Sequence, residues 1–133
     1  MTGADIIGAM LLADDSVTQL VPPSKLKSGR LPENCPLDVI LVRTVSSVDR
    51  PTLSREGTVR RTDRVSVAVR AESYRGQKAI IAAVRSCCSG REGDLGGGRN
   101  VAVTSAGLGP DMDGPGNSFE QTQDFRVSFD AEY

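Results

Sequence analysis

The sequence predicts a single α+β domain, in which a mainly antiparallel sheet of about four strands carries two helices on one face. Its 133 residues are the length of one domain. Apolar residues recur at helical spacing in two segments, and four other segments have the apolar content or alternation of strands. The expected order is helix, strand, strand, helix, strand, strand. Neighbouring strand pairs with helices between them are typical of an antiparallel sheet covered on one face.

The first helix is expected over residues 4–20, because six apolar residues fall on one stripe: Ile6, Ile7, Met10, Leu11, Val17 and Leu20. Asp14 and Asp15 lie inside this range and either end the helix or start a second turn. Residues 21–36 contain four prolines and are expected to form a connecting loop.

The first two strands differ in their patterns. Residues 37–45 are apolar at both parities, which predicts a strand covered on both faces, by a helix on one side and by core or a neighbouring subunit on the other. Residues 64–71 alternate between apolar and polar, which predicts a half-exposed strand. The polar segment 46–62 is expected to be a long loop between them, and such loops are usually functional or mobile.

The second half of the chain repeats this order. Residues 74–89 have apolar side chains at helical spacing and predict the second helix. A glycine-rich turn over 90–98 leads to a strand over 100–106. The segment 107–121 is rich in glycine and is expected to be a long, exposed hairpin connection. The final strand is expected over 122–131, where phenylalanine and valine alternate with polar residues.

The composition argues against catalysis. The chain contains no histidine, so the usual general base, the Ser-His-Asp arrangement and the commonest metal ligand are missing. Cys35, Cys87 and Cys88 have neither metal-ligand spacing nor the pattern of a disulfide framework. Cys87 and Cys88 fall on the apolar face of the second helix, where core packing is expected. The sequence therefore predicts no catalytic residues, no metal and no cofactor, and a domain that acts through its surfaces.

Two glycine-containing segments resemble ligand loops, but neither has the full pattern. Residues 93–99 lack the Lys-Ser/Thr of a phosphate-binding loop, and a strand follows them where a helix is needed. Residues 111–122 begin with two aspartates, as a calcium loop does, but proline and threonine occupy later ligand positions. Both are expected to be ordinary connections. The N-terminus does not resemble a signal peptide, and no apolar run is long enough to span a bilayer, which predicts a soluble protein made in a cytoplasm.

Charge is unevenly distributed along a chain whose formal net charge is only −1. The segment from Arg43 to Arg75 contains eight arginines and four acidic residues, a net charge of +4. Between Glu92 and Tyr133, eight acidic residues outnumber two arginines, a net charge of −6. One half is therefore basic and the other acidic.

Three interpretations of this charge pattern stay open. It is an ordinary solvated surface, a nucleic-acid-binding surface, or a surface through which copies associate head to tail. The basic stretch has no interleaved aromatic residues, which argues against nucleic acid. The excess of 13 arginines over 3 lysines favours association, because guanidinium groups make bidentate contacts at interfaces.

Five segments, taken in order, carry a resemblance to a known family. They are LLADDSVTQLV, RLPENCPLDVILVRTV, RRTDRVSVAVRAES, KAIIAAVRSC and QTQDFRVSFDAEY. Together they resemble the tail-completion or tail-terminator proteins of long-tailed bacteriophages and prophages, over nearly the whole chain. The resemblance lies in the type and order of residues, and no invariant catalytic residue takes part in it.

The resemblance implies a structural virion protein, not an enzyme, assembled in the host cytoplasm. It implies a homohexameric ring at the head-proximal end of the tail tube, which terminates tail polymerisation and provides the head-tail joining surface. The implied partners are other copies of the chain, the tail tube protein and the head connector or neck protein. DNA passes through the lumen as cargo, and no membrane is involved. The alternative is another neck or head-completion adaptor. A third class, a small-molecule or nucleotide-binding enzyme, would need a pocket with convergent polar groups.

Under this interpretation, two sets of charged residues are expected at interfaces. Those on the loop 46–62 are expected to contact a neighbouring subunit or the tail-tube end: Arg50, Arg55, Arg60 and Arg61. Those on the second hairpin are expected to contact the opposite side of the ring or the head connector: Asp111 and Asp113. Two acidic residues of the last strand are expected to meet two arginines of the second strand, either within the sheet or across subunits: Asp124 and Asp130 with Arg64 and Arg70.

Overall fold

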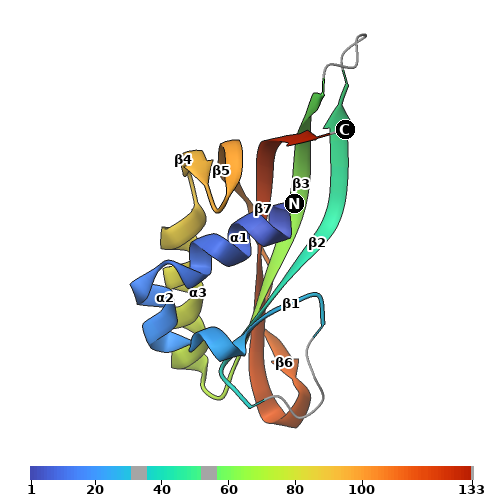
Figure 1. The fold of residues 1–133 in the computed structure, drawn as a ribbon. Helices are drawn as coiled ribbons and strands as arrows, with labels where there is room; N and C mark the ends of the chain where they lie inside the picture. Colours follow the sequence, from blue (N-terminus) through green and yellow to red (C-terminus); the bar gives the residue numbers. More distant parts are fainter. Residues whose placement is uncertain (31–35, 52–56, 133) are drawn as a thin grey trace.

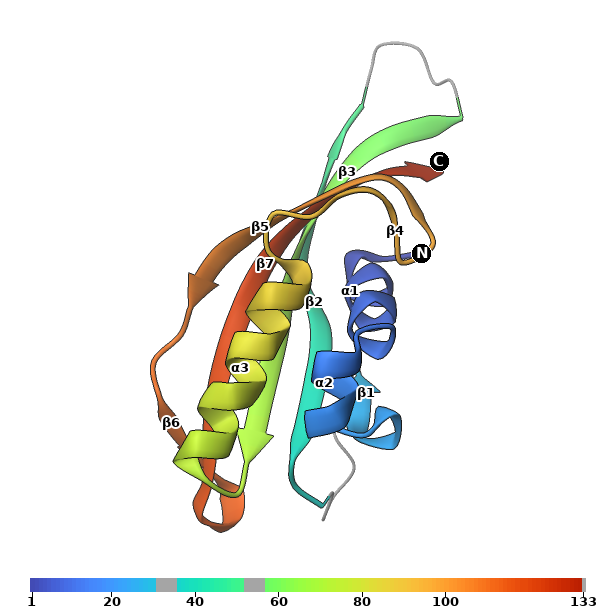
Figure 2. The same ribbon diagram turned by 90° about the vertical axis from the view of Figure 1, so that its left-hand side faces the viewer.

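Three α-helices cover one face of a curled, seven-stranded sheet in this computed structural model, which describes residues 1–30, 36–51 and 57–132 (Figures 1 and 2). Within the described residues, the opposite face of the sheet carries no helix. The predicted α+β class is confirmed, but the number and order of the elements differ from the prediction. The helices are α1 (Gly3–Leu12), α2 (Asp15–Leu20) and α3 (Tyr74–Cys88).

The strands are β1 (Leu26–Ser28), β2 (Val39–Arg50), β3 (Thr58–Ala71), β4 (Glu92–Leu95), β5 (Gly98–Leu108), β6 (Met112–Gly114) and β7 (Ser118–Glu132). Their order across the sheet is β1-β2-β3-β7-β5-β4, and β6 pairs with β7 outside this row. The four long strands β2, β3, β7 and β5 are antiparallel neighbours and correspond to the four predicted strands. The short strand β1 pairs in parallel with one end of β2.

The prediction of about four strands is wrong because short strands form in segments that were expected to be connections. Residues 90–98 include β4 and the tight turn into β5, in which Gly96 and Gly97 adopt positive φ angles of 56° and 83°. Residues 107–121 include β6 and the first part of β7. These segments are held by backbone pairing, and most of their side chains stay in solvent, so they lack the apolar alternation that marks a longer strand.

The prediction of a loop over 46–62 is also wrong for most of that range. Strand β2 continues to Arg50 and β3 begins at Thr58, so the two strands form a long hairpin that extends beyond the helices (Figures 1 and 2). Every residue of β2 from Arg43 onward is exposed, which removes the alternation that would reveal a strand. Residues 52–56 lie outside the described residues.

The predicted first helix is divided at the acidic pair. Helix α1 ends at Leu12, and Asp14 caps α2, because its Oδ1 accepts hydrogen bonds from the backbone N–H groups of Ser16 and Val17 at 2.9 and 3.3 Å. All three helices therefore pack on one face where two were predicted. The second predicted helix, over residues 74–89, is confirmed as α3.

The core lies between the helices and the sheet. The largest buried side chains include Ile6 and Leu11 of α1, Ile80 of α3, and Phe125 and Phe129 of β7. This face alone supplies most of the apolar burial that stabilises the chain. The thiols of Cys87 and Cys88 are buried at its edge, as the sequence predicted.

The first third of β2, residues 39–42, is buried on both faces as its sequence predicted, whereas residues 43–45 of the same predicted segment are exposed. Ile40 and Val42 point into the helix-covered core, and Val39 and Leu41, on the opposite face, are also buried. Beyond Val42 the strand is exposed. The buried residues at the start of β2 thus anchor the hairpin in the core, whereas its remaining residues are exposed to solvent.

One buried polar contact attaches the start of α1 to the sheet. Asp63 of β3 is 2% exposed, and its Oδ2 accepts a hydrogen bond from the backbone N–H of Gly3 at 2.7 Å. This N–H has no partner within the helix, because the first N–H groups of an α-helix lack one. Gly3 is required for the close approach, since a Cβ atom there would lie 2.7 Å from the Cβ of Asp63.

We predict that Asp63→Ala lowers the free energy of unfolding by about 1–3 kcal/mol, because it leaves the buried N–H of Gly3 without an acceptor. Asp63→Asn retains a carbonyl oxygen at this position and should cost less. Urea denaturation followed by circular dichroism measures both variants. The exposed Asp113→Ala variant is the control, with an expected change within about 0.5 kcal/mol. Equal stability of the Asp63→Ala variant and the unmodified chain would contradict the prediction.

Candidate functional site

The face of the sheet without helices, here called the open face, carries most of the charged residues predicted to act at interfaces. The ladder between β3 and β7 runs without a break from Thr58 opposite Glu132 to Ala71 opposite Phe119. In this register even-numbered residues pair with even-numbered residues. Odd-numbered residues such as Val65 are buried under the helices, so the even-numbered residues of both strands lie on the open face.

Three arginines of β3 form ion pairs with three acidic residues of β7 across the open face. Each side chain in these pairs is between 23% and 38% exposed. Partly exposed pairs of this kind contribute no more than about 1 kcal/mol each. The pairs, with their N···O distances, are Arg60–Asp130 (3.1 Å), Arg64–Asp124 (2.8 Å) and Arg70–Glu120 (3.3 Å).

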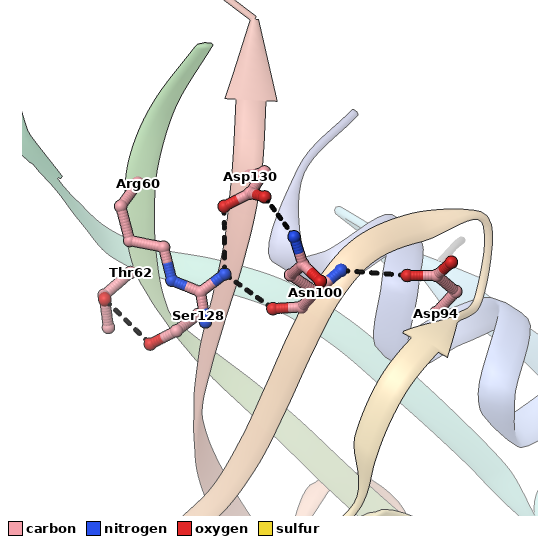
Figure 3. A network of polar contacts seen from close by, with 6 residues as sticks. All are labelled: Arg60, Thr62, Asp94, Asn100, Ser128 and Asp130. Atoms are coloured by element: carbon pink, nitrogen blue, oxygen red, sulfur yellow. Dashed lines mark hydrogen bonds and ion pairs between the residues drawn. The ribbon is translucent and has the colours of Figure 1, made fainter.

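The Arg60 pair belongs to a network that links four strands (Figure 3). The Nη1 of Arg60 donates to Asp130 Oδ1 and to the carbonyl oxygen of Asn100 on β5. The amide Nδ2 of Asn100 donates to Asp130 Oδ2, and its backbone N–H donates to Oδ1 of Asp94 on β4 at 3.0 Å. Asn100 has a positive φ of 51°, a conformation that asparagine tolerates better than most residues.

The other arginines of the hairpin differ in their surroundings. Arg61 lies on the helix side of β3, where its Nε donates to Asp49 Oδ1 at 2.6 Å. Arg50 is exposed at the end of β2 and has no ion pair among the described residues. Arg55 lies outside the described residues. Arg50, Arg60 and Arg61 are on strands of the hairpin and not on the predicted loop.

The two acidic residues of the second hairpin have different roles. Asp111 attaches this hairpin to α3: Lys78 Nζ donates to its Oδ1 at 2.6 Å, and the Tyr74 hydroxyl donates to its Oδ2 at 3.1 Å. Lys78 also donates to Gln121 Oε1 at 2.9 Å. Asp113, on β6, is exposed and has no ion pair within the part of the chain that the structure describes.

These contacts shift the pKa values of several side chains. The hydrogen bond from Lys78 holds the pKa of Asp111 below its ordinary value of 3.8, and the same contact raises the pKa of Lys78 above 10.5. Hydrogen bonds from Asn100 and Arg60 lower the pKa of Asp130, and the hydrogen bond from Arg61 lowers that of Asp49. The hydrogen bond to Cys87, together with burial, raises the pKa of the Cys88 thiol, so Cys88 is a poor nucleophile.

The basic and acidic segments of the sequence are interleaved in space. Asp124 meets Arg64 within the sheet, whereas Asp130 pairs with Arg60 and Arg70 pairs with Glu120. Glu120 was not among the predicted site residues, although the shared even parity of the arginines and acids on β3 and β7 is a signal for these pairs. Asp49, Lys78 and Asn100 were also missed, because their partners come from other elements.

Among the residues that the structure describes, no group of three or more histidine, cysteine, aspartate or glutamate side chains is placed to hold a metal ion. None of the helices in the same residues is long and apolar enough to cross a membrane. The feature that stands out is a long sheet with charged and hydroxyl side chains on its open face.

Comparisons with known proteins identify the family of the chain. The family of tail completion protein gp17 matches residues 6–130. The chain therefore belongs to this family of phage tail structural proteins, and the resemblance seen in its sequence is confirmed. Its fold is similar to that of a chain in the virion of a native gene transfer agent particle, with a TM-score of 0.70 and 17% sequence identity, over 97% of this chain and 95% of that chain. No curated protein matches the sequence.

We predict that Lys78→Met raises the pKa of Asp111 toward 3.8, because it removes the hydrogen bond that stabilises the carboxylate. A depressed pKa in the folded state stabilises the fold at pH values above the unfolded pKa, and this contribution is lost as the pH falls through the folded pKa. Carboxyl ¹³C shifts between pH 2 and 6 measure the change. Asp130 is the internal control, since its partners are unchanged. An unchanged Asp111 titration would contradict the assignment.

Proposed function

We propose that the chain forms a homohexameric ring at the head-proximal end of a phage tail tube, where it terminates tail polymerisation and provides the surface for head-tail joining. The observation that carries this proposal is the family match over residues 6–130. The similar fold of a virion chain over nearly its whole length supports it. The partners are then other copies of the chain, the tail tube protein and the head connector or neck protein.

The geometry of the sheet supports assembly with other chains. Strand β1 covers only residues Ile40 to Val42 of β2, so the edge of β2 from Thr44 to Arg50 has no strand beside it in the described residues. A free edge presents unpaired N–H and C=O groups that another strand can bind. Val45 lies on this edge and is 60% exposed. An exposed apolar side chain on a free strand edge is suited to an interface between subunits.

The charged residues predicted at interfaces fit this proposal in part. On the hairpin, Arg61 and Asp49 bind each other on the helix side, and this partly exposed ion pair is open to a neighbouring subunit or to the tail-tube end. At the other end of the sheet, Asp113 remains for the opposite side of the ring or the head connector, while Asp111 holds its hairpin in place. The paired residues Arg64, Arg70 and Asp124 then shape the sheet, and their contribution to assembly is indirect.

The alternative is another neck or head-completion adaptor, which would share the composition and the ring. The two functions differ in the surface that they bind. A terminator caps isolated tail tubes, whereas a head adaptor binds only the portal side of a filled head. Electron microscopy of tails from a host that lacks the gene distinguishes them, because loss of a terminator gives overlong, headless tails.

We expect native mass spectrometry at low salt to detect a hexamer of the purified chain, with or without the tail tube protein. Val45→Lys should prevent the hexamer and the capping of tail tubes, since it places a charge on the free edge of β2. Ser86→Lys, on the exposed side of α3, is the control and should assemble normally. A chain that stays monomeric at high concentration under both conditions would refute the ring.

A further inference from the structure

A hollow on the open face is lined by arginines from three strands. It has a volume of about 440 Å³ and lies over β2, β3, β5 and β7. Its seven lining residues include no acidic side chain. They are Val48, Arg50, Arg60, Thr62, Ala102, Arg126 and Ser128.

The positions of these arginines are unfavourable for an isolated sheet. Arg50 of β2 lies directly opposite Arg60 of β3, and Arg64 of β3 lies directly opposite Arg126 of β7. Like charges that face each other across neighbouring strands destabilise a sheet. Both pairs lie on the open face, so four guanidinium groups are concentrated there.

The acidic neighbours neutralise only one arginine of each pair. Asp130 binds Arg60, and Asp124 binds Arg64. Arg50 and Arg126 are exposed, and neither forms an ion pair within the described ranges. Two uncompensated guanidinium groups therefore line the same hollow from opposite sides of Arg60.

The floor of the hollow offers hydroxyl groups as further hydrogen-bonding partners. Thr62 Oγ1 and Ser128 Oγ lie 2.9 Å apart and point toward one another between β3 and β7 (Figure 3). Guanidinium and hydroxyl groups are among the side-chain groups that contact phosphate oxygens. Arginine in particular binds phosphate through two parallel N–H···O bonds.

The composition of the hollow favours a nucleic-acid backbone over a protein partner. Arginine is enriched at protein interfaces as well, but three arginines and no acidic residue among the seven lining residues make the hollow strongly positive. Interfaces with DNA are more polar and more positively charged. No aromatic side chain lines the hollow, so stacking of single-stranded bases has no platform there, and a duplex is the better fit.

We propose that this part of the open face binds the phosphate backbone of double-stranded DNA without sequence preference, through Arg50, Arg60 and Arg126. Thr62 and Ser128 supply hydrogen bonds to the same phosphates. Arg50 and Arg60 then contact DNA, and contacts of the hairpin with other protein chains are made by its helix-side face, which carries Arg61 and Asp49. The chain as a whole carries a formal net charge of −1, so its binding comes from the local arrangement of charge.

Fluorescence anisotropy with a labelled 20-base-pair duplex tests this proposal at several salt concentrations. The full chain should bind, with log K falling linearly against log salt. Arg50→Ala/Arg126→Ala should reduce affinity at 0.1 M salt by about tenfold per arginine and reduce the slope by about 0.9 per arginine. Arg50→Lys/Arg126→Lys keeps both charges and should keep the slope.

The matched control is Arg75→Ala/Arg85→Ala, which removes two exposed arginines of α3 and gives the same net charge. Equal loss of affinity in this control would overturn the proposal, as would undetectable binding of the full chain at 0.05 M salt. Tighter binding of polyglutamate than of the duplex would instead identify an acidic protein as the partner and would also overturn it. The proposal does not rest on ring formation, which Val45→Lys tests separately.

Discussion

The register of β3 against β7 is the constraint on which the rest of the structure depends. This ladder joins 14 residues of each strand at the centre of the sheet. It sends Val65 and Phe125 into the core and leaves Arg64 and Asp124 on the open face. Because side chains alternate along a strand, a slip of one residue would bury the charges and expose the core. Burial of the apolar face therefore determines which charged residues meet.

The same register brings the basic and acidic segments of the sequence together on the open face, where several of their charges form ion pairs. The basic and acidic segments lie far apart along the chain but on neighbouring strands, and three cross-strand ion pairs join them. Each pair is partly exposed and contributes little stability. Their larger effect is to reduce the number of free charges on the open face. Arg50 lies directly opposite Arg60, and Arg126 lies directly opposite Arg64. Arg60 and Arg64 bind the nearby carboxylates, so Arg50 and Arg126 are left without an ion pair among the described residues.

Sequence patterns predicted the parts of the fold whose burial is periodic. The helix 74–89 was predicted within one residue and the strand 64–71 was predicted correctly at its C-terminal end, since their apolar side chains face one core, but β3 begins six residues earlier, at Thr58. The extension of β2 to Arg50 was not predicted, because its exposed side chains carry no period and its strand form depends on backbone pairing with β3. The ion pairs of the open face could be anticipated only as alternatives, since the sequence does not specify register. The contact of Asp111 with Lys78 depends on how the second hairpin folds back onto α3, which no local pattern encodes.

The two ends of the sheet differ in how they are stabilised. Near Val42 the sheet is covered by helices, whereas from Thr44 to Arg50 strand β2 is held by its pairing with β3 and buries no side chain. Two-stranded hairpins are at best marginally stable in water. The hairpin here gains support from β7, which runs beside β3 as far as Glu132, whereas the outer side of β2 from Thr44 to Arg50 has no neighbouring strand among the described residues. A partner that paired with this edge would bury Val45 and extend the backbone ladder, and the hairpin would then gain in the assembly the stability that it lacks in the single chain.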